Sequence, residues 1–472
     1  MAIHQTVTVL DQIAVSPPPE TTAEISIPLT FIDVVWLVTA PVHRLIFYHH
    51  PISRTDFVDS LIPRMKDSLS QTLRHYSPLA GRVIVSPDKT SIPEIRYVEG
   101  DTIPLVIAEF DSTNSNDFSQ LVSNDARSSM DLNPLIPRLL PCSRAPDGSL
   151  AIPLFALQVT LFPDVGICIG VTNHHTTGDG SSIFQFMKAW AFFSSHREDD
   201  KGKISLSLPS RYLPVHDRTL FKDPKGSGLA KVYWDLVKTI NIEESHNGYR
   251  LPLVTDKVRS TFVVTRDDIQ RLKNRVLARS PKLVHVSSFT VTCSYVWSCL
   301  VRSRNVINKE DKEEEMENFL CLANCRARLD PPLPTNYFGN CVVPCLGSTS
   351  TKSLMEDEGF VKAAEAIGEG IRSQLYNDDK DGVLRGAGDW LAVMAKMRVC
   401  MSLAGSPKFD YYELDFGWGK PEKFDIPSID LTGATSVGAA KDHEGGLEVG
   451  LALSCEQMES FARIFSEGLK AL

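Results

Sequence analysis

The residues best suited to chemistry in this chain lie in one short polar segment between two apolar runs. The sequence VTNHHTTGDGSSIF occupies residues 171–184, after a strand-like run and before the helix-like run IFQFMKAWAFF. It holds His174, His175 and Asp179. An imidazole can both accept and return a proton near pH 7. The segment therefore predicts a histidine acting as general base on a bound substrate, with Asp179 holding the local geometry.

A histidine and an aspartate four residues apart more often belong to a surface loop that caps the next helix, but three features argue against that role here. The segment connects a buried strand to a buried helix, so its side chains reach an interior cleft. Gly178 and Gly180 flank Asp179, which allows unusual backbone angles and the close approach of other segments. Ser181 and Ser182 offer hydroxyls for the helix cap, so Asp179 is not needed there.

Other kinds of catalytic site find less support in the sequence. The chain has neither an H-E-x-x-H zinc motif nor a G-x-S-x-G nucleophile elbow. Two cysteine pairs, Cys321–Cys325 and Cys341–Cys345, resemble a four-thiolate metal site. Their basic and apolar surroundings favour buried free thiols instead, so no bound metal is expected.

Length and composition fit a globular protein of two domains. The chain has 472 residues, with apolar and charged fractions near the globular average. Its net charge of -9 argues against nucleic-acid binding. No apolar run approaches the roughly 20 residues of a membrane span. Residues 1–19 lack the pattern of a signal peptide, so a cytoplasmic protein is expected.

Periodicity and turn residues predict alternating strands and helices around the polar segment. Residues 151–172 are expected to form two strands joined by a Pro-Asp turn, and residues 183–193 a core-facing helix. A helix is expected before Ser77, and the chain is expected to end in a strand and a helix. Residues 194–228 are rich in Ser, Pro, Asp, Lys and Gly, which predicts a linker.

Two motifs make the chain resemble one enzyme family. Residues 175–180, HTTGDG, match the HxxxDG motif of the plant BAHD acyltransferases, and residues 415–419, DFGWG, match their second signature. Four further stretches are similar to the family, and the YFGNC form within the third resembles the branch that acylates anthocyanins and other phenolic glucosides. The four stretches are LTFIDVVWL (29–37), HYSPLAGR (75–82), RARLDPPLPTNYFGNC (326–341) and VLRGAGDW (383–390).

The resemblance implies an acyl transfer from coenzyme A to a hydroxyl or amine, through a ternary complex and without an acyl-enzyme. It assigns His175 as the base that takes the acceptor proton and returns a proton to the departing thiolate. It makes Asp179 a structural support paired with an arginine, for which Arg326 is preferred over Arg328. Acyl-CoA would then be a co-substrate, with no permanently bound cofactor.

The DFGWG signature has two expected roles. The indole donor of Trp418 could stabilise the developing oxyanion, which makes it a second catalytic candidate. In the family the motif as a whole lies off the reacting centre and shapes the coenzyme site. Structural support of the site is expected from Gly178, Gly180, Asp415 and Gly417.

Pocket residues are chosen by their place near family-like stretches. The expected coenzyme contacts are Lys257, Ser260, Ser287 and Ser288. The expected lining of the acceptor or acyl pocket is Trp36, Thr39 and Phe338.

The fold implied by the resemblance is α/β, with two chloramphenicol acetyltransferase-like domains on mixed sheets and a channel between them. The first domain would span residues 1–193 and the second, carrying DFGWG, residues 229–472. Residues 194–228 would be the crossover, and residues 384–408 would cross back to the first domain. A monomer binding acyl-CoA and a small acceptor is expected, with no nucleic-acid or membrane partner.

Two alternatives and the choice of donor stay open. His174-His175-x3-Asp179-Gly180 also fits the HHxxxDG motif of condensation enzymes, and an inert relative could act as a binding protein. Malonyl, aromatic and short aliphatic donors all occur in similar enzymes. Because no Arg or Lys closely follows His175 to hold a malonyl carboxylate, an aromatic or aliphatic donor is favoured. The acceptor is expected to be a hydroxyl of a specialised metabolite such as a flavonoid glycoside.

Overall fold

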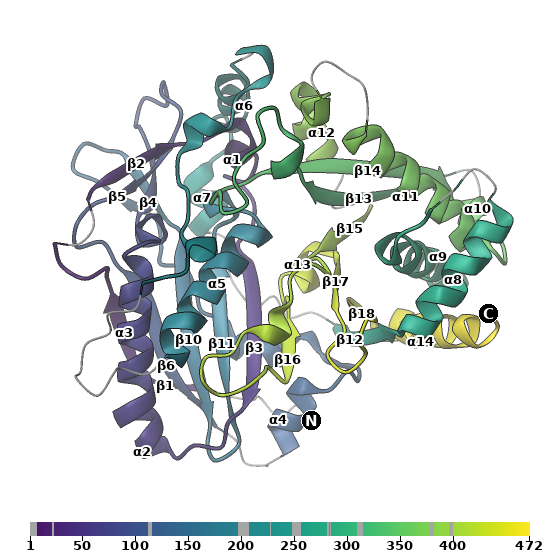
Figure 1. Cartoon of the computed structure of the whole chain (residues 1–472), viewed down its shortest axis with the longest axis horizontal. Coiled ribbons are helices and arrows are strands. Elements are labelled where there is room, and N and C mark those ends of the chain that lie inside the picture. The colour runs from purple at the N-terminus through teal and green to yellow at the C-terminus, as the bar shows by residue number, and fades with distance from the viewer. Residues whose placement is uncertain are drawn as a thin grey trace.

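The computed structural model places two large sheets side by side, each covered by its own helices (Figure 1). The helices and strands of the chain follow one another in the mixed order typical of α/β proteins. The structure describes residues 7–20, 23–111, 116–196, 207–226, 228–247, 256–280, 283, 285–308, 315–376, 382–395 and 400–472.

The first sheet carries the polar segment at the end of one of its central strands. Its central strands are fully buried apolar runs, which is why they lie inside a sheet covered on both faces. The predicted pair of strands with its turn is confirmed. In spatial order the strands are β1 (Val7–Val15), β6 (Ile103–Phe110), β10 (Phe155–Phe162), β11 (Gly166–Asn173), β3 (Val42–His49) and β16 (Lys423–Asp425).

Two helices cover the face of the first sheet that holds the main core. These are α3 (Ile62–Leu73) and α5 (Gly180–Ser195), which lie against each other, with α5 in front of β10 and β11 and α3 to its left (Figure 1). Trp190 of α5 is completely buried among them. The expected helices before Ser77 and over residues 183–193 are confirmed. Two short helices flank this part of the chain, α2 (Arg54–Asp56) and α4 (Asn116–Val122).

The second sheet is built mainly from the C-terminal half. Its strands, in spatial order, are β14 (Val342–Ser350), β13 (Met316–Asn324), β15 (Met401–Ala404), β17 (Thr435–Ala439), β18 (Leu447–Ser454), β12 (Lys257–Val264) and β7 (Arg127–Ser128). Its helices share one core, except the shortest, whose Ile429 packs in a small separate cluster. They are α8 (Arg266–Arg279), α9 (Ser288–Asn308), α10 (Thr351–Met355), α11 (Gly359–Leu375), α13 (Ile429–Thr432) and α14 (Cys455–Lys470).

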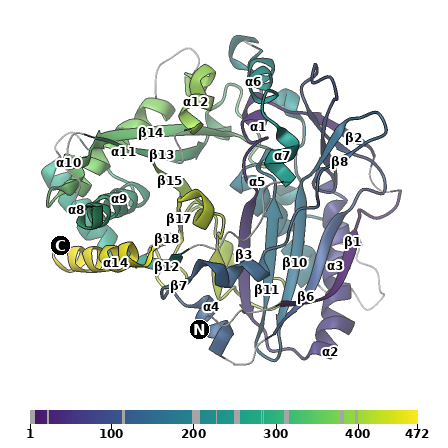
Figure 2. The same cartoon turned by 180° about the vertical axis from the view of Figure 1, so that it is seen from behind.

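A smaller third sheet, which the sequence did not predict, lies at the upper outer side of the first sheet in both views (Figure 1 and Figure 2). Short helices from both halves pack against it around Phe31 and Trp390. Its strands are β2 (Ile25–Pro28), β5 (Glu94–Tyr97), β4 (Arg82–Val85), β9 (Leu150–Pro153) and β8 (Ser143–Arg144), and the helices are α1 (Phe31–Val35), α6 (Leu229–Val237), α7 (Ile242–Asn247) and α12 (Trp390–Ala395).

The two halves exchange strands. β16 of the C-terminal half pairs with β3 and so extends the first sheet, while β7 of the N-terminal half pairs with β12 in the second. Of the expected crossover 194–228, residues 197–206 and 227 lie outside the described residues, as do residues 396–399 of the expected return segment 384–408.

The expected α/β architecture of two units on mixed sheets is confirmed. Parallel pairs join β6 to β10 in the first sheet and β13 to β15 in the second, while most other neighbours are antiparallel. Among the described residues, every helix is too short or too polar to cross a membrane.

Candidate active site

His175 lies where the buried strand β11 ends and α5 begins. The strand stops at Asn173, and residues 175–177 form one turn of 3-10 helix before α5 starts at Gly180. The N-cap of α5 is Asp179, whose Oδ1 accepts a hydrogen bond from the Ser182 amide at 3.1 Å. The expectation that Asp179 is not needed as a cap is therefore wrong. Ser182 already lies in the first turn of the helix, where its hydroxyl cannot act as the cap.

Asp179 forms a buried, two-pronged ion pair with Arg326. The Nη1 of Arg326 donates to Oδ2 at 2.8 Å and its Nη2 to Oδ1 at 3.1 Å, and both side chains are almost fully buried. The Cys341 amide donates to Oδ2 at 2.9 Å. Burial opposes ionisation, but Arg326 outweighs it and holds the pKa of Asp179 below its ordinary value. Arg328 is exposed and donates to the hydroxyl of Tyr376 instead.

The two glycines of the motif serve close packing rather than unusual backbone angles. Gly178 has φ 163 and ψ 165, an extended conformation open to any residue, and Gly180 is the first residue of α5. A Cβ on Gly180 would lie 2.7 Å from the ring of Phe409, and one on Gly178 would lie 2.9 Å from Cβ of Ser182. The expected close approach is thus present, whereas the expected special backbone angles are not.

The imidazole of His175 is partly buried against Trp36. The two rings stack with centroids 3.8 Å apart and an interplanar angle of 17°. Asn340 holds the backbone by donating from Nδ2 to the His175 carbonyl at 3.0 Å. The Nδ1 of His175 is buried and has no hydrogen-bond partner among the described residues, while the Asn340 side chain also interacts with the imidazole. Burial, helped by the charge of Arg44, lowers the pKa of His175 to about 4, so the ring is neutral near pH 7.

A second buried ion pair supports the same segment from the other side. Asp33 of α1 accepts from Nε of Arg218 at 3.1 Å, and its other oxygen accepts from Nδ2 of Asn340 at 2.9 Å. Arg218 also donates to the carbonyl of Phe338. Sequence reasoning missed these three residues. Asp33 and Asn340 lie inside the family-like stretches, and that position is the signal that could have identified them.

His174, the neighbour and chemical equivalent of His175, has both ring nitrogens occupied. Its Nδ1 accepts from the Thr176 amide at 3.2 Å, and its Nε2 lies 2.8 Å from Nε2 of His246 on α7. Its side chain is fully buried. His174 therefore holds the loop and α7 together and has no free lone pair for a substrate.

A buried arginine, Arg44 on β3, lies close to the same strand end. Its Nη1 donates to Oδ1 of Asn173 at 2.6 Å, two residues before His175. The guanidinium also interacts with the phenol of Tyr411. Sequence reasoning missed Arg44, because residues about 130 apart in the chain become neighbours only through the pairing of β3 with β11.

The DFGWG loop is built around Asp415. Its Oδ1 accepts from the backbone amides of Gly417, Trp418 and Gly419 at 2.7, 2.9 and 3.0 Å. Gly417 and Gly419 have φ values of 95 and 87, which favour glycine. Gly417 lies against Ser195, the last residue of α5, so the loop closes the far end of that helix.

The predicted role of Trp418 as oxyanion donor is wrong, because the indole lies at the opposite end of the first sheet from His175. It packs against Tyr48 and His50, with ring centroids 5.3 and 5.6 Å away. Tyr48 pairs with Ile167, six residues before the end of β11, and six strand steps span about 20 Å. Its Nε1 is buried in the core without a partner among the described residues.

The expected coenzyme contacts lie on two elements of the second sheet. Lys257 and Ser260 stand three residues apart on β12, so their side chains point to opposite faces. Lys257 donates to the Asp430 carbonyl at 2.9 Å, and Ser260 donates to a loop carbonyl. Ser287 accepts from the Thr290 amide, and Ser288 opens α9. These four residues remain predictions as coenzyme contacts.

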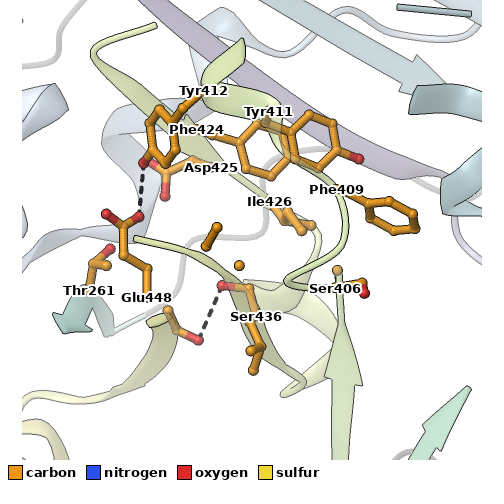
Figure 3. A pocket seen from close by; sticks show the side chains of 15 residues that line it. Thr261, Ser406, Phe409, Tyr411, Tyr412, Phe424, Asp425, Ile426, Ser436 and Glu448 are labelled. Carbon is orange, nitrogen blue, oxygen red and sulfur yellow. Dashed lines mark hydrogen bonds between the residues drawn. The ribbon is translucent and has the colours of Figure 1, made fainter. Parts of the chain in front are cut away.

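Two of the three expected pocket residues are neighbours beside the imidazole: Trp36 stacks on His175, and Thr39 donates to the Trp36 carbonyl at 2.9 Å. Phe338 packs its ring against Tyr76 and His216. All three remain predictions as pocket lining. A small cavity of about 30 Å³ opens where the two large sheets face each other, with Tyr411 stacked on Phe424 in its wall (Figure 3). That volume has room for only a few water molecules.

The four cysteines that resembled a metal site are free, buried thiols on β13, β14 and the turns between them. Cys321 pairs in register with Cys345, and the sulfurs of Cys325 and Cys341 lie 3.4 Å apart. In the part of the chain that the structure describes, no cluster of three or more His, Cys, Asp or Glu has metal-binding geometry.

Comparison with known proteins places the whole chain in one family. A family model described as the Transferase family matches residues 5–467. The chain is 42% identical over 470 residues to "Phenolic glucoside malonyltransferase 1" of Nicotiana tabacum, covering 98% of this chain and 99% of the relative. It is 40% identical over 471 residues to "Malonyl-coenzyme A:anthocyanin 3-O-glucoside-6''-O-malonyltransferase" of Dahlia pinnata, covering 98% of each. A coumaroyltransferase of Arabidopsis thaliana, "Coumaroyl-CoA:anthocyanidin 3-O-glucoside-6''-O-coumaroyltransferase 1", is 33% identical over 98% of this chain and 97% of its own.

Solved structures share the fold across nearly the full length. Vinorine synthase matches with a TM-score of 0.66 at 19% identity, covering 96% of each chain. TRI101 of F. graminearum, complexed with ethyl coenzyme A, matches with a TM-score of 0.64 at 15% identity, covering 92% of this chain and 96% of its own.

Proposed function

This chain belongs to the Transferase family, the BAHD acyltransferases, and from that membership we propose that it transfers an acyl group from coenzyme A to a sugar hydroxyl of a phenolic glycoside. The observation that carries the proposal is His175 itself. It is a neutral, partly buried imidazole at a strand end, and its buried Nδ1 has no hydrogen-bonding partner among the described residues. The names of the relatives support a glucoside as acceptor.

In the proposed reaction His175 handles one proton in both directions. A lone pair of the ring takes the proton of the acceptor hydroxyl while the oxygen attacks the thioester carbonyl. When the tetrahedral intermediate collapses, the carbon–sulfur bond breaks and the imidazolium returns the proton to the thiolate. The products are an ester and free coenzyme A, and no acyl-enzyme forms.

Positioning, not charge relay, is the task of Asp179 in this proposal. Both carboxylate oxygens are engaged by Arg326, the Ser182 amide and the Cys341 amide. The ion pair fixes the segment 337–341, and Asn340 of that segment holds the His175 carbonyl. The base is thus held between two ion pairs on either side of the strand end.

The test measures release of free thiol from a set of acyl-CoAs, with mass spectrometry of the acceptor. Malonyl-CoA, coumaroyl-CoA and isovaleryl-CoA are each offered with a phenolic glucoside, with its aglycone and with no acceptor. Ester on the glucoside, with thiol release that depends on the acceptor, is the expected result. No ester with any pair would favour an inert relative that acts as a binding protein. A cytoplasmic, monomeric protein stays a prediction from the sequence.

A further inference from the structure

Among the residues that the structure describes, the buried arginines have carboxylate partners, with one exception. Four described arginines expose less than a tenth of their surface, and three of them are paired with an aspartate. The fourth, Arg44, forms no ion pair with any described carboxylate. A buried cation without a counter-ion is strongly unfavourable. The three paired arginines are Arg218 with Asp33, Arg259 with Asp430, and Arg326 with Asp179.

The contacts of Arg44 are neutral and lie toward the active site. Arg44 stands opposite Val171 in the sheet, but its Nη1 reaches along β11 to Oδ1 of Asn173 at 2.6 Å. That direction is toward His175, two residues further along the chain. The guanidinium also interacts with the phenol of Tyr411, whose ring stacks on Phe424 (Figure 3). After burial, the positive charge of Arg44 also helps to lower the pKa of His175.

We propose that Arg44 binds the free carboxylate of a dicarboxylic acyl donor, and that this contact selects malonyl-CoA over uncharged acyl-CoAs. The inference rests on the proposed acyl transfer at His175. In a malonyl thioester one methylene separates the carboxylate from the reacting carbonyl. When that carbonyl lies beside His175, the carboxylate must also lie close to His175, where a nearby cation can bind it. The planar fork of an arginine fits a carboxylate with two parallel hydrogen bonds.

The inference replaces the expectation of an aromatic or aliphatic donor. That expectation used only the segment after His175, in which residues 176–184 hold no Arg or Lys. The cation comes instead from β3, which the antiparallel pairing with β11 brings to the same strand end. The amide of Asn173 and the phenol of Tyr411 hold the guanidinium there, and neither group carries a charge that would neutralise it.

The test compares malonyl-CoA with isovaleryl-CoA. In the isovaleryl group an uncharged isopropyl of similar size takes the place of the malonyl carboxylate. With one glucoside acceptor, kcat/KM is measured for both donors in the wild type, Arg44→Met and Arg64→Met. Arg64 is exposed on α3 and serves as the control. We expect the wild type to prefer malonyl-CoA by about 10²-fold or more, and Arg44→Met to lower that ratio by about 10²-fold, the effect of losing a buried charge-assisted pair. Arg64→Met should leave the ratio unchanged.

Two results would overturn the inference. A wild type that uses isovaleryl-CoA as well as malonyl-CoA would show that no carboxylate is recognised. An equal loss with both donors in Arg44→Met would assign Arg44 to the transition state or to the fold instead. If the Met variant does not fold, Arg44→Lys provides the test, because lysine keeps the positive charge but lacks the planar guanidinium. A fall of about tenfold in the ratio of kcat/KM for malonyl-CoA to that for isovaleryl-CoA supports the inference. An unchanged ratio contradicts it. No transfer from any donor would contradict the proposed function rather than this assignment.

Discussion

The imidazole of His175 lies flat against the indole of Trp36, with ring centroids 3.8 Å apart. Trp36 follows α1, which Asp33 ties to Arg218, and His175 follows β11, so the stack joins two elements from distant parts of the chain. The indole excludes water from one face of the base and fixes its plane. It is therefore expected to orient the base without reacting itself.

Replacing Trp36 should lower turnover by loosening the base. We expect Trp36→Ala to reduce kcat by about 10- to 100-fold, because a small displacement of a catalytic group has effects of that size. Trp36→Phe keeps an aromatic face and should retain most of the activity. Steady-state kinetics on the two variants, with circular dichroism to check folding, measures the difference. Equal activity of Trp36→Ala and the wild type would rule out the orienting role.

The two adjacent histidines should separate by function. His175→Ala is expected to lose about 10² to 10⁴ in kcat, the usual effect of removing a general base, while still binding coenzyme A. His174→Ala removes the contact with His246 and should mainly lower the melting temperature. Kinetics, coenzyme titration and thermal melts on both variants measure this. An inactive His174→Ala beside an active His175→Ala would reverse the assignment.

The ion pair between Asp179 and Arg326 should prove structural and coupled. Asp179→Asn leaves a buried guanidinium without its partner, which is expected to cost about 3 to 5 kcal/mol of stability. Arg326→Met should cost a similar amount, and the double variant should cost less than the two single losses added together. Denaturant unfolding of the four proteins tests the cycle.

The exposed Arg328 provides the control for that cycle. Arg328→Met should change stability by no more than about 0.5 kcal/mol and show no coupling to Asp179. Inactive Asp179→Asn with unchanged stability would speak for a charge relay and against the structural role.

The pH profile should reflect the buried base. Because the pKa of His175 is lowered to about 4, the base is already free of its proton at pH 6, and kcat/KM should not change through that group between pH 8 and 6. Arg44→Met removes a nearby positive charge, so the pKa should rise and the acid limb should move to higher pH. Measurement of kcat/KM from pH 5 to 9 checks both statements. A wild-type midpoint near 6.5 would contradict them.

Stability measured in the same buffers is the control for the pH profile. Burial lowers the pKa of His43 to about 3 and that of His216 and His246 to about 4, below the ordinary value of 6.5. The unfolded chain therefore takes up protons first as the pH falls. The stability that these neutral rings contribute is complete above pH 6.5 and is lost on the way to pH 4, so the melting temperature should fall over that window.

Trp418 should matter for the fold and not for the chemical step. It packs on Tyr48 at the far end of the first sheet, so Trp418→Phe should leave kcat within about threefold of the wild type. Trp418→Ala removes a large buried side chain, for which a loss of about 3 to 5 kcal/mol is usual. A loss of 10²-fold in kcat for the Phe variant, with normal stability, would restore the oxyanion role.

The sequence alone determined what depends on local pattern. The strand–turn–strand over residues 151–172 and the buried helix after the polar segment were predictable, because apolar periodicity is a local property. The motif spacing, also local, marked His175 as the proposed base. The motif also carried the family, and with it the architecture of two mixed sheets. It did not determine where the second signature lies. HTTGDG leads into the first turn of α5, whereas DFGWG packs against the last residue of that helix.

Tertiary structure decided which distant residues surround the base. Arg44 reaches Asn173 only through the register of β3 with β11. Asn340 reaches the His175 loop from a segment that Arg326 and Asp33 both hold. The contacts of Arg44 with Asn173 and of Asn340 with the His175 loop each join residues more than a hundred positions apart. Such contacts depend on strand pairing and on the need to neutralise buried charge. Both operate between distant parts of the folded chain, so no fixed spacing of residues in the sequence indicates them.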